Sequence, residues 1–239
     1  MTLEQKIGQM MLVGYPGGPE GEAVLRRVLD ARPMGNLILF ARNGDEPEAL
    51  KARLSGLRSI MEARSGAQPL IAIDQEGGIV VRLKDGLTPL PGAMALAASM
   101  AGGVSLADVE ALAAVSGAEL SSMGIDWNLA PDADVNVNPL NPVIGVRSFG
   151  EDPGKVADLV SAYARGLRKS GAAATAKHFP GHGDTNVDSH LGLPRVDAPA
   201  GRLESVELVP FRRLIAEGVG SIMTAHVLFP AVEPDPIPA

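Results

Sequence analysis

Residues 174–194 read ATAKHFPGHGDTNVDSHLGLP and join a short apolar run to a polar loop. The run delivers Lys177 and His178 at its end, and Pro180 and the glycines after it interrupt any helical or strand period. This order is typical of a buried strand that ends in a surface loop. Because loops on a rigid scaffold concentrate binding and catalytic groups, we predict a functional site at the end of this strand.

The loop is rich in groups that bind ligands or transfer protons. Three of the four histidines of the chain fall within thirteen residues, and two aspartates lie among them. A single aspartate two residues before a histidine is compatible with ordinary turn chemistry. Six polar groups in one glycine-interrupted loop favour a functional role instead. The six are Lys177, His178, His182, Asp184, Asp188 and His190.

Outward from this stretch, short apolar runs alternate with amphipathic segments along the whole chain. Apolar residues at helical spacing predict helices at residues 3–12, 20–32, 47–65, 105–123, 155–170 and 206–217. Apolar runs bounded by turn residues predict strands at residues 13–15, 35–40, 69–73, 125–130, 172–176 and 221–226. About six strand-then-helix units imply parallel β-structure with right-handed crossovers.

We predict an α/β fold of the TIM-type (β/α)8 barrel class, in which about six of the eight units are visible. Residues 1–239 are expected to form a single barrel domain that lacks the last strands. Polar residues follow the strands, and in a barrel these positions share the C-terminal rim, where active sites are built. They are Asp74, residues 132–138, Lys177 with His178, and His226. A doubly wound open sheet is the alternative, and it too binds ligands at the carboxyl ends of its strands.

The composition narrows the class of partner. The chain has 239 residues, of which 46% are hydrophobic and 21% charged, as in ordinary globular proteins. A net charge of −7 argues against nucleic acid or an anionic membrane as the main partner. No cysteine is present, which excludes disulfides and thiolate metal sites. Neither a GxGxxG nor a GxxxxGK[ST] motif supports a nucleotide, and we expect no cofactor and no metal.

The start of the chain lacks the basic and apolar regions of a signal peptide, and no apolar run reaches the ~18 residues of a membrane span. A cytoplasmic location is therefore the simplest expectation. The sequence does not indicate an oligomeric state.

Four motifs resemble those of glycoside hydrolase family 3. They are IDQEGG at residues 73–78, RSFGEDP at 147–153, KHFPGHGDT at 177–185 and DSHLGLP at 188–194. Within the family they are similar to the β-N-acetylglucosaminidase (β-hexosaminidase) branch, whose members act on peptidoglycan-derived sugars. The resemblance implies a glycosidase that releases terminal β-N-acetylglucosamine with retention, and N-acetylglucosaminides as its small saccharide substrates.

The resemblance also implies roles for individual residues. His190 would be the general acid/base, oriented by Asp188. A histidine with a pKa near 6.5 can give and take a proton near neutral pH, and a neighbouring carboxylate fixes its tautomer. Ile79 stands where many relatives have a further arginine. The implied sugar contacts are Asp74, Arg82, Arg147, Lys177 and His178.

One family feature is missing from the sequence. Retaining glycosidases need a carboxylate nucleophile below the sugar ring. The family's nucleophile is an aspartate on a later strand, and no matching motif follows His190. We therefore expect two unpaired strand edges in an unclosed barrel, and a chain that binds sugar at most and does not turn it over.

Three other functions remain open at this point. His178, His182, Asp184, Asp188 and His190 are all metal-ligand types, so a metal-dependent barrel hydrolase is one alternative. A non-catalytic sugar-binding protein is another, because of the missing nucleophile. A glycoside phosphorylase is the third, because a neutral histidine repels phosphate less than a carboxylate does.

Overall fold

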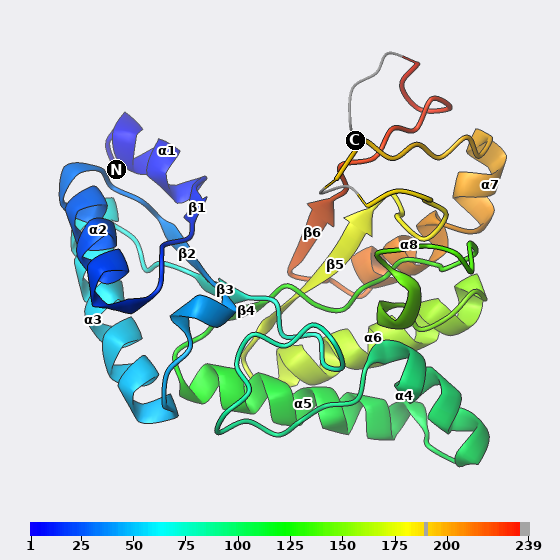
Figure 1. Ribbon diagram of the computed structural model, residues 1–239, viewed down its shortest axis with the longest axis horizontal. Helices are drawn as coiled ribbons and strands as arrows, with labels where there is room; N and C mark the ends of the chain where they lie inside the picture. Colours follow the sequence, from blue (N-terminus) through cyan, green and yellow to red (C-terminus); the bar gives the residue numbers. More distant parts are fainter. Residues whose placement is uncertain (189–190, 235–239) are drawn as a thin grey trace.

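The computed structural model describes residues 1–188 and 191–234. Six strands form one parallel sheet in which each strand pairs with the next in the chain. They are β1 (Leu12–Val13), β2 (Asn36–Leu39), β3 (Ile71–Ile73), β4 (Trp127–Asn128), β5 (Ala173–Phe179) and β6 (Ser221–Thr224). The sheet curls, with the helices on its outer side (Figure 1).

The strand order confirms the predicted barrel class. A doubly wound sheet reverses its strand order at a switch point, whereas this sheet runs from β1 to β6 without reversal. Within the described residues β1 pairs only with β2, and β6 pairs only with β5. Figure 1 shows these two strands at opposite edges of the sheet, so the barrel is incomplete, as predicted. The assignment of residues 1–239 to one domain stays a prediction.

The six predicted helices are present, with ends shifted by a few residues. Thr2 and Ser105 cap the first and fourth of them with capping boxes, and prolines open the third and fifth. Gly124 follows the fourth with φ 84°, a conformation that glycine adopts without strain. These helices are α1 (Leu3–Gln9), α2 (Gly18–Ala31), α3 (Pro47–Ser65), α5 (Leu106–Ser122), α6 (Pro153–Lys169) and α8 (Leu208–Ala216).

The sequence did not predict the short elements inside the loops. These are α4 (Ala93–Ser99), α7 (Ala200–Ser205) and the 3₁₀ turns η1 (Ala41–Asn43), η2 (Met100–Gly102) and η3 (Gly145–Arg147). Elements of three to seven residues span at most two turns, too few for an apolar period to show. The strand predicted at residues 125–130 is also shorter, because only Trp127 and Asn128 enter the ladder.

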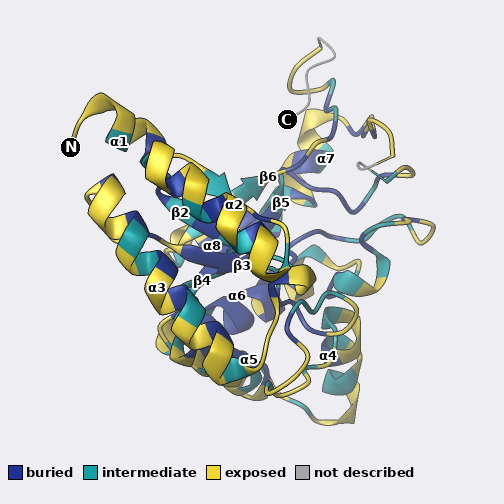
Figure 2. Cartoon of the chain, turned by 60° about the vertical axis from the view of Figure 1, so that its left-hand side comes forward, coloured by how far each residue is buried: buried dark blue, intermediate teal, exposed yellow. Residues whose placement is uncertain are grey.

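The apolar core lies between the sheet and its helices. Leu37 and Leu39 of β2 and all of β3 are buried, as expected of parallel strands covered on both faces. One cluster joins β5 to α5 and α6, and a second joins β2 and β3 to α2 and α3. In Figure 2, α6 is largely buried at the centre, whereas α2 and α3 turn exposed faces outward. This packing fixes the sheet and thereby the ends of its strands.

Because the strands are parallel, their carboxyl ends meet at one rim. Asp74 directly follows β3, and Asp132 follows β4 by a few residues. Lys177 and His178 lie near the end of β5, and His226 follows β6. No helix in the described part of the chain is long and apolar enough to cross a membrane.

Candidate functional site

Lys177 is the buried centre of the rim. Its side chain is 2% exposed, and its Nζ lies 2.9 Å from Oδ1 of Asp74 and 2.6 Å from Oε1 of Glu76. A buried ammonium group is tolerated only when it is paired, and two carboxylates pair this one. The strand end thus carries a fixed positive charge between two acids of the loop after β3.

A β-bulge lets two consecutive residues of β5 contribute to the same cavity. Successive side chains of a regular strand point to opposite faces. Lys177 pairs with Met223, but Phe179 pairs with Thr224, so His178 is an extra residue in the ladder. Bulges re-aim side chains in this way. Lys177 and His178 therefore both line the cavity at the rim.

Arg147 and Glu76 form a two-pronged ion pair. The Nε of Arg147 lies 3.0 Å from Oε2 of Glu76, and a terminal nitrogen lies 2.8 Å from Oε1. Burial raises the pKa of Glu76, but the hydrogen bond from Arg147 and the charge of Lys177 outweigh it and lower the pKa to about 2. Glu76 is therefore ionised at neutral pH and holds the side chains of Arg147 and Lys177 in place.

The five predicted sugar contacts come together. Arg82 lies 3.6 Å from Oδ2 of Asp74 and completes the set. All five line one cavity of about 340 Å³, within the size range of small-molecule sites. They are Asp74, Arg82, Arg147, Lys177 and His178, and other polar lining residues are Glu76, His182, Thr224 and His226.

His178 is tied to two buried aspartates of the loop after β4. Its Nδ1 lies 2.8 Å from Oδ2 of Asp134 and 3.9 Å from Oδ2 of Asp132. Burial lowers the pKa of His178 to about 4, against the opposing charge of Asp132. Burial raises the pKa of Asp132 well above its usual value, and the charge of Asp134 adds to this. At neutral pH the ring is therefore uncharged.

The predicted catalytic dyad is only partly described. His190 lies outside the described residues. Asp188 is described, and it is not among the residues that line the cavity. Asp184, in the same loop, pairs with Arg202 at 2.9 Å, and Arg202 also lies 2.9 Å from the buried Glu207. Arg202 thus anchors the loop after β5 at Asp184, ahead of the predicted dyad.

Three members of the predicted metal-ligand set, namely His178, His182 and Asp184, bond different partners. Nδ1 of His182 bonds the hydroxyl of Thr185, Nδ1 of His178 bonds Asp134, and Asp184 pairs with Arg202. Within the described residues, the histidine and carboxylate group close enough to share an ion is Asp132, Asp134 and His178. Nδ1 of His178 and Oδ2 of Asp134 already bond each other, and a terminal nitrogen of Arg147 lies 3.6 Å from Oδ2 of Asp132, where its positive charge disfavours a cation.

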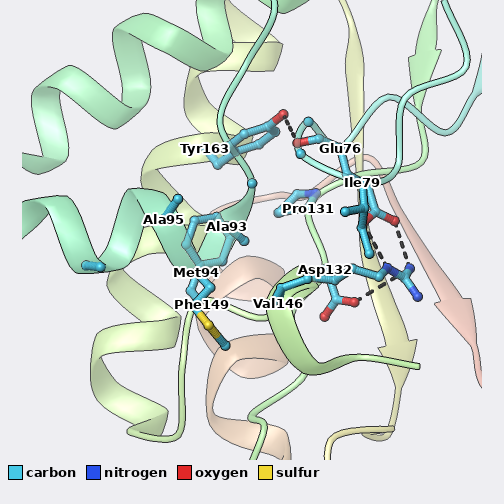
Figure 3. A pocket seen from close by; sticks show the side chains of 15 residues that line it. Glu76, Ile79, Ala93, Met94, Ala95, Pro131, Asp132, Val146, Phe149 and Tyr163 are labelled. Atoms are coloured by element: carbon cyan, nitrogen blue, oxygen red, sulfur yellow. Dashed lines mark hydrogen bonds and ion pairs between the residues drawn. The ribbon is translucent and has the colours of Figure 1, made fainter. Parts of the chain in front are cut away.

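A larger cavity of about 440 Å³ adjoins the smaller one, since Glu76 and Arg147 line both. In Figure 3 apolar side chains dominate its walls, among them Ile79, Met94 and Phe149. Tyr163 donates a hydrogen bond to the Glu76 carbonyl there. Binding sites need convergent polar groups as well as volume, and these are concentrated in the smaller cavity. The smaller cavity is therefore the candidate site.

Three acidic residues around Lys177, His178 and Arg147 were not predicted individually as site residues. They are Glu76, Asp132 and Asp134. Glu76 stands in a quoted motif, but only Asp74 of that motif was assigned a role. Asp132 and Asp134 stand in a stretch predicted to be polar and near the rim. The available signal was the pair of acids, spaced by one residue, a few residues after β4. The loop after β5, predicted at the surface, is in fact buried from Pro180 to Gly183.

Residues 2–239 match the N-terminal domain of glycosyl hydrolase family 3. The chain belongs to this family. Beta-hexosaminidase A of Pseudoalteromonas piscicida is 38% identical over 98% of this chain and 42% of its own length. The beta-hexosaminidase of Methylococcus capsulatus is 40% identical over 92% of this chain and 64% of its own length. These names confirm the predicted branch of the family.

Solved structures agree in fold. A family 3 beta-N-acetylglucosaminidase from a Paenibacillus species matches all of this chain and 44% of its own, with 44% identity and a TM-score of 0.93. NagZ from Neisseria gonorrhoeae, in complex with N-trifluoroacetyl-D-glucosamine, matches 95% of this chain and 66% of its own, with 33% identity and a TM-score of 0.84. The chain thus spans less than two thirds of the length of these relatives.

Proposed function

We propose that the rim cavity binds the terminal N-acetylglucosamine of β-linked saccharides, as part of a retaining β-N-acetylglucosaminidase. The convergence of Asp74, Arg82, Arg147, Lys177 and His178 on one cavity carries this proposal. Four of them belong to motifs that resemble the family's, and Arg82 follows the first of these motifs in the same loop. The relatives named above support it, because they are named as hexosaminidases and one of them holds a glucosamine derivative.

The chemistry of the cavity suits a sugar. Lys177, Arg82 and Arg147 have only donors, and the Asp74 carboxylate has only acceptors. Sugar hydroxyls both donate and accept, so they can use both kinds of partner at once. The ion pairs hold these side chains before ligand arrives, so the cost of ordering them on binding is small. A sugar held at several hydroxyls is presented in one orientation, which favours reaction at one carbon.

Proton transfer is assigned to the predicted dyad of His190 and Asp188. The acid two residues before the histidine would fix its tautomer and stabilise the imidazolium as it forms. The ion pairs of Arg202 with Asp184 and Glu207 support this role by anchoring the start of the loop. A peptidoglycan-derived substrate and a cytoplasmic location remain predictions from the sequence.

We further propose that the 239-residue chain binds sugar without turnover. Retention needs a carboxylate that is free to attack the anomeric carbon. Within the described residues the carboxylates that line the cavity are Asp74 and Glu76, and both are paired with cations. Neither is therefore suited to act as the nucleophile.

Calorimetric titration with N-acetylglucosamine tests the binding half of the proposal. We expect one site per chain, and we expect Asp74→Ala to remove detectable binding. Lys84→Ala is the matched control, because Lys84 is exposed and does not line this cavity. Equal binding by wild type and Asp74→Ala would contradict the assignment of the cavity.

Incubation with p-nitrophenyl N-acetyl-β-D-glucosaminide tests the second half. No release of nitrophenol is expected from the 239-residue chain. Release that is lost on His190→Ala would show that another carboxylate serves as nucleophile.

A further inference from the structure

The carboxylate of Asp134 is completely buried and receives the N–H groups of two residues from the loop after β5. The main-chain nitrogen of His182 lies 2.6 Å from its Oδ1, and the main-chain nitrogen of His178 lies 3.3 Å from each oxygen. The ring Nδ1 of His178 lies 2.8 Å from Oδ2. One side chain from the loop after β4 thus fixes both the backbone and the ring of His178.

We infer that Asp134 is a positioning residue that holds His178 as the Nδ1–H tautomer, so that Nε2 accepts a hydrogen bond from a hydroxyl of the bound sugar. This role rests on the proposed function, which it deepens by adding an acceptor to the sugar site.

The pattern of donors around Asp134 favours this tautomer. Burial raises the pKa of Asp134 above its usual value, whereas the main-chain N–H groups that both of its oxygens receive stabilise the carboxylate form. An ionised Asp134 can only accept, so the ring must place its single proton on Nδ1. In a catalytic triad, a carboxylate that accepts a hydrogen bond from Nδ1–H fixes the tautomer of the histidine in the same way. The opposite tautomer would require a protonated Asp134.

The direction of Nε2 matters because the cavity is rich in donors. Lys177, Arg82 and Arg147 can only donate, and their hydrogen bonds occupy lone pairs of the sugar hydroxyls. The hydroxyl protons then need acceptors. Asp74 is one, but its Oδ1 is already bonded to Lys177. Within the described residues Nε2 of His178 has no hydrogen-bond partner, although the ring lines the cavity, so it is available as a second acceptor.

The tautomer can be read directly from the full chain. Histidine-selective ¹⁵N labelling and long-range proton–nitrogen correlation at pH 7 distinguish Nδ1–H from Nε2–H, and the spectrum of a His178→Gln variant assigns the signals. We expect Nδ1–H in the wild type. In Asp134→Asn the single amide oxygen should stay with His182 N–H, and the amide NH₂ should face Nδ1. We therefore expect the ring to switch to Nε2–H.

Asp126→Asn is the matched control. Asp126 also accepts a main-chain N–H, from Ile71 at 3.0 Å, and a charged donor, from Arg58 at 2.6 Å, but it precedes β4 at the other end of the sheet. Its substitution should leave the His178 tautomer unchanged. An Nε2–H signal in the wild type would overturn the inference, and so would an unchanged tautomer in folded Asp134→Asn. The wild-type spectrum decides the point even if that variant does not fold.

Sugar affinity provides the second readout. Converting the acceptor into a donor leaves one hydroxyl proton without a partner, and we expect Asp134→Asn to weaken N-acetylglucosamine binding about tenfold or more. Fluorine accepts but cannot donate. We therefore compare N-acetylglucosamine with its 3-, 4- and 6-deoxyfluoro analogues. For one of these analogues, the loss of affinity relative to N-acetylglucosamine should be larger for the wild type than for Asp134→Asn.

Unchanged affinity in a variant with a switched tautomer would overturn the role in sugar binding. Absence of any sugar binding by the wild type would contradict the proposed function and with it the acceptor role. The tautomer spectra would still decide whether Asp134 sets the ring, so the two failures are distinguishable.

Discussion

The Nζ of Lys177 lies 2.6 Å from Oε1 of Glu76, and the two side chains are only 2% and 7% exposed. They come from the ends of different strands, so this contact ties β5 to the loop after β3. Removing one partner of a buried ion pair leaves an uncompensated charge, which costs more than the pair itself contributes. The cavity proposed to bind sugar is thus also a point on which the stability of the fold depends.

Lys177→Met tests that dependence. The variant leaves Glu76 with Arg147 alone and Asp74 with the more distant Arg82, and we expect the free energy of unfolding to fall by about 1–3 kcal/mol. Urea denaturation followed by circular dichroism measures the change. The exposed Lys84 offers a matched control, and Lys84→Met should change stability by less than about 0.5 kcal/mol. Equal stability of the two variants would contradict the account of Lys177.

Glu76 should make the protein acid-sensitive. Its pKa is about 2 in the folded protein, against an ordinary value of 4.5. Its contribution is therefore present above pH 4.5 and is lost as the pH falls from 4.5 to 2. We expect Glu76→Gln to remove up to about 3 kcal/mol of the stability lost in this window. Denaturation at several pH values measures it. Glu62→Gln, at an exposed position of α3, should keep the wild-type slope.

Gly183 is needed because two loops touch at that point. A Cβ at this position would lie 1.9 Å from the carbonyl oxygen of Val135, which neither backbone can accommodate without moving. We expect Gly183→Ala to separate the loop after β5 from the loop that carries Asp134, and to lower both stability and N-acetylglucosamine affinity. Gly201→Ala is the control, because a Cβ there meets nothing within 4 Å. A Gly183→Ala variant with wild-type affinity would argue against a rigid contact.

Arg202 should control the flexibility of the loop after β5, in which the dyad is predicted. Arg202→Met leaves Asp184 unpaired and Glu207 buried without its cation, at a cost of about 1–3 kcal/mol. We expect faster cleavage by proteases within residues 181–194, read by mass spectrometry. Arg195→Met should not change the cleavage rate, since Arg195 and its partner Asp197 are both exposed. Equal rates for the two variants would mean that Arg202 does not anchor the loop.

The sequence predicted the elements that depend on local signals. Pro47 marked the start of α3 because its fixed φ suits the first turn of a helix. Residues 35–40 and 172–176 were recognised as strands because short apolar runs between turn residues suit a buried parallel sheet. Since the carboxyl ends of parallel strands share one rim, the gathering of Asp74, Lys177 and His178 followed from the fold class.

The pairing of acids with bases in the site depends on contacts between segments that are distant in the sequence. The partner of His178 is Asp134, 44 residues earlier, and the partner of Arg147 is Glu76, 71 residues earlier. No local pattern states which acid pairs with which base. The bulge at His178 likewise arises from the register of β5 against β6, which the sequence of β5 alone does not contain. Sequence motifs therefore pointed to cationic residues of the cavity but not to the acids that hold them in place.

A crystal structure of the 239-residue chain with N-acetylglucosamine tests the central claim most directly. We predict the sugar in the cavity of about 340 Å³, with its hydroxyl oxygens within hydrogen-bonding distance of Asp74, Arg147 and Lys177. A sugar bound instead in the apolar cavity beside Met94 and Phe149, or no sugar at the rim at saturating concentration, would contradict the account.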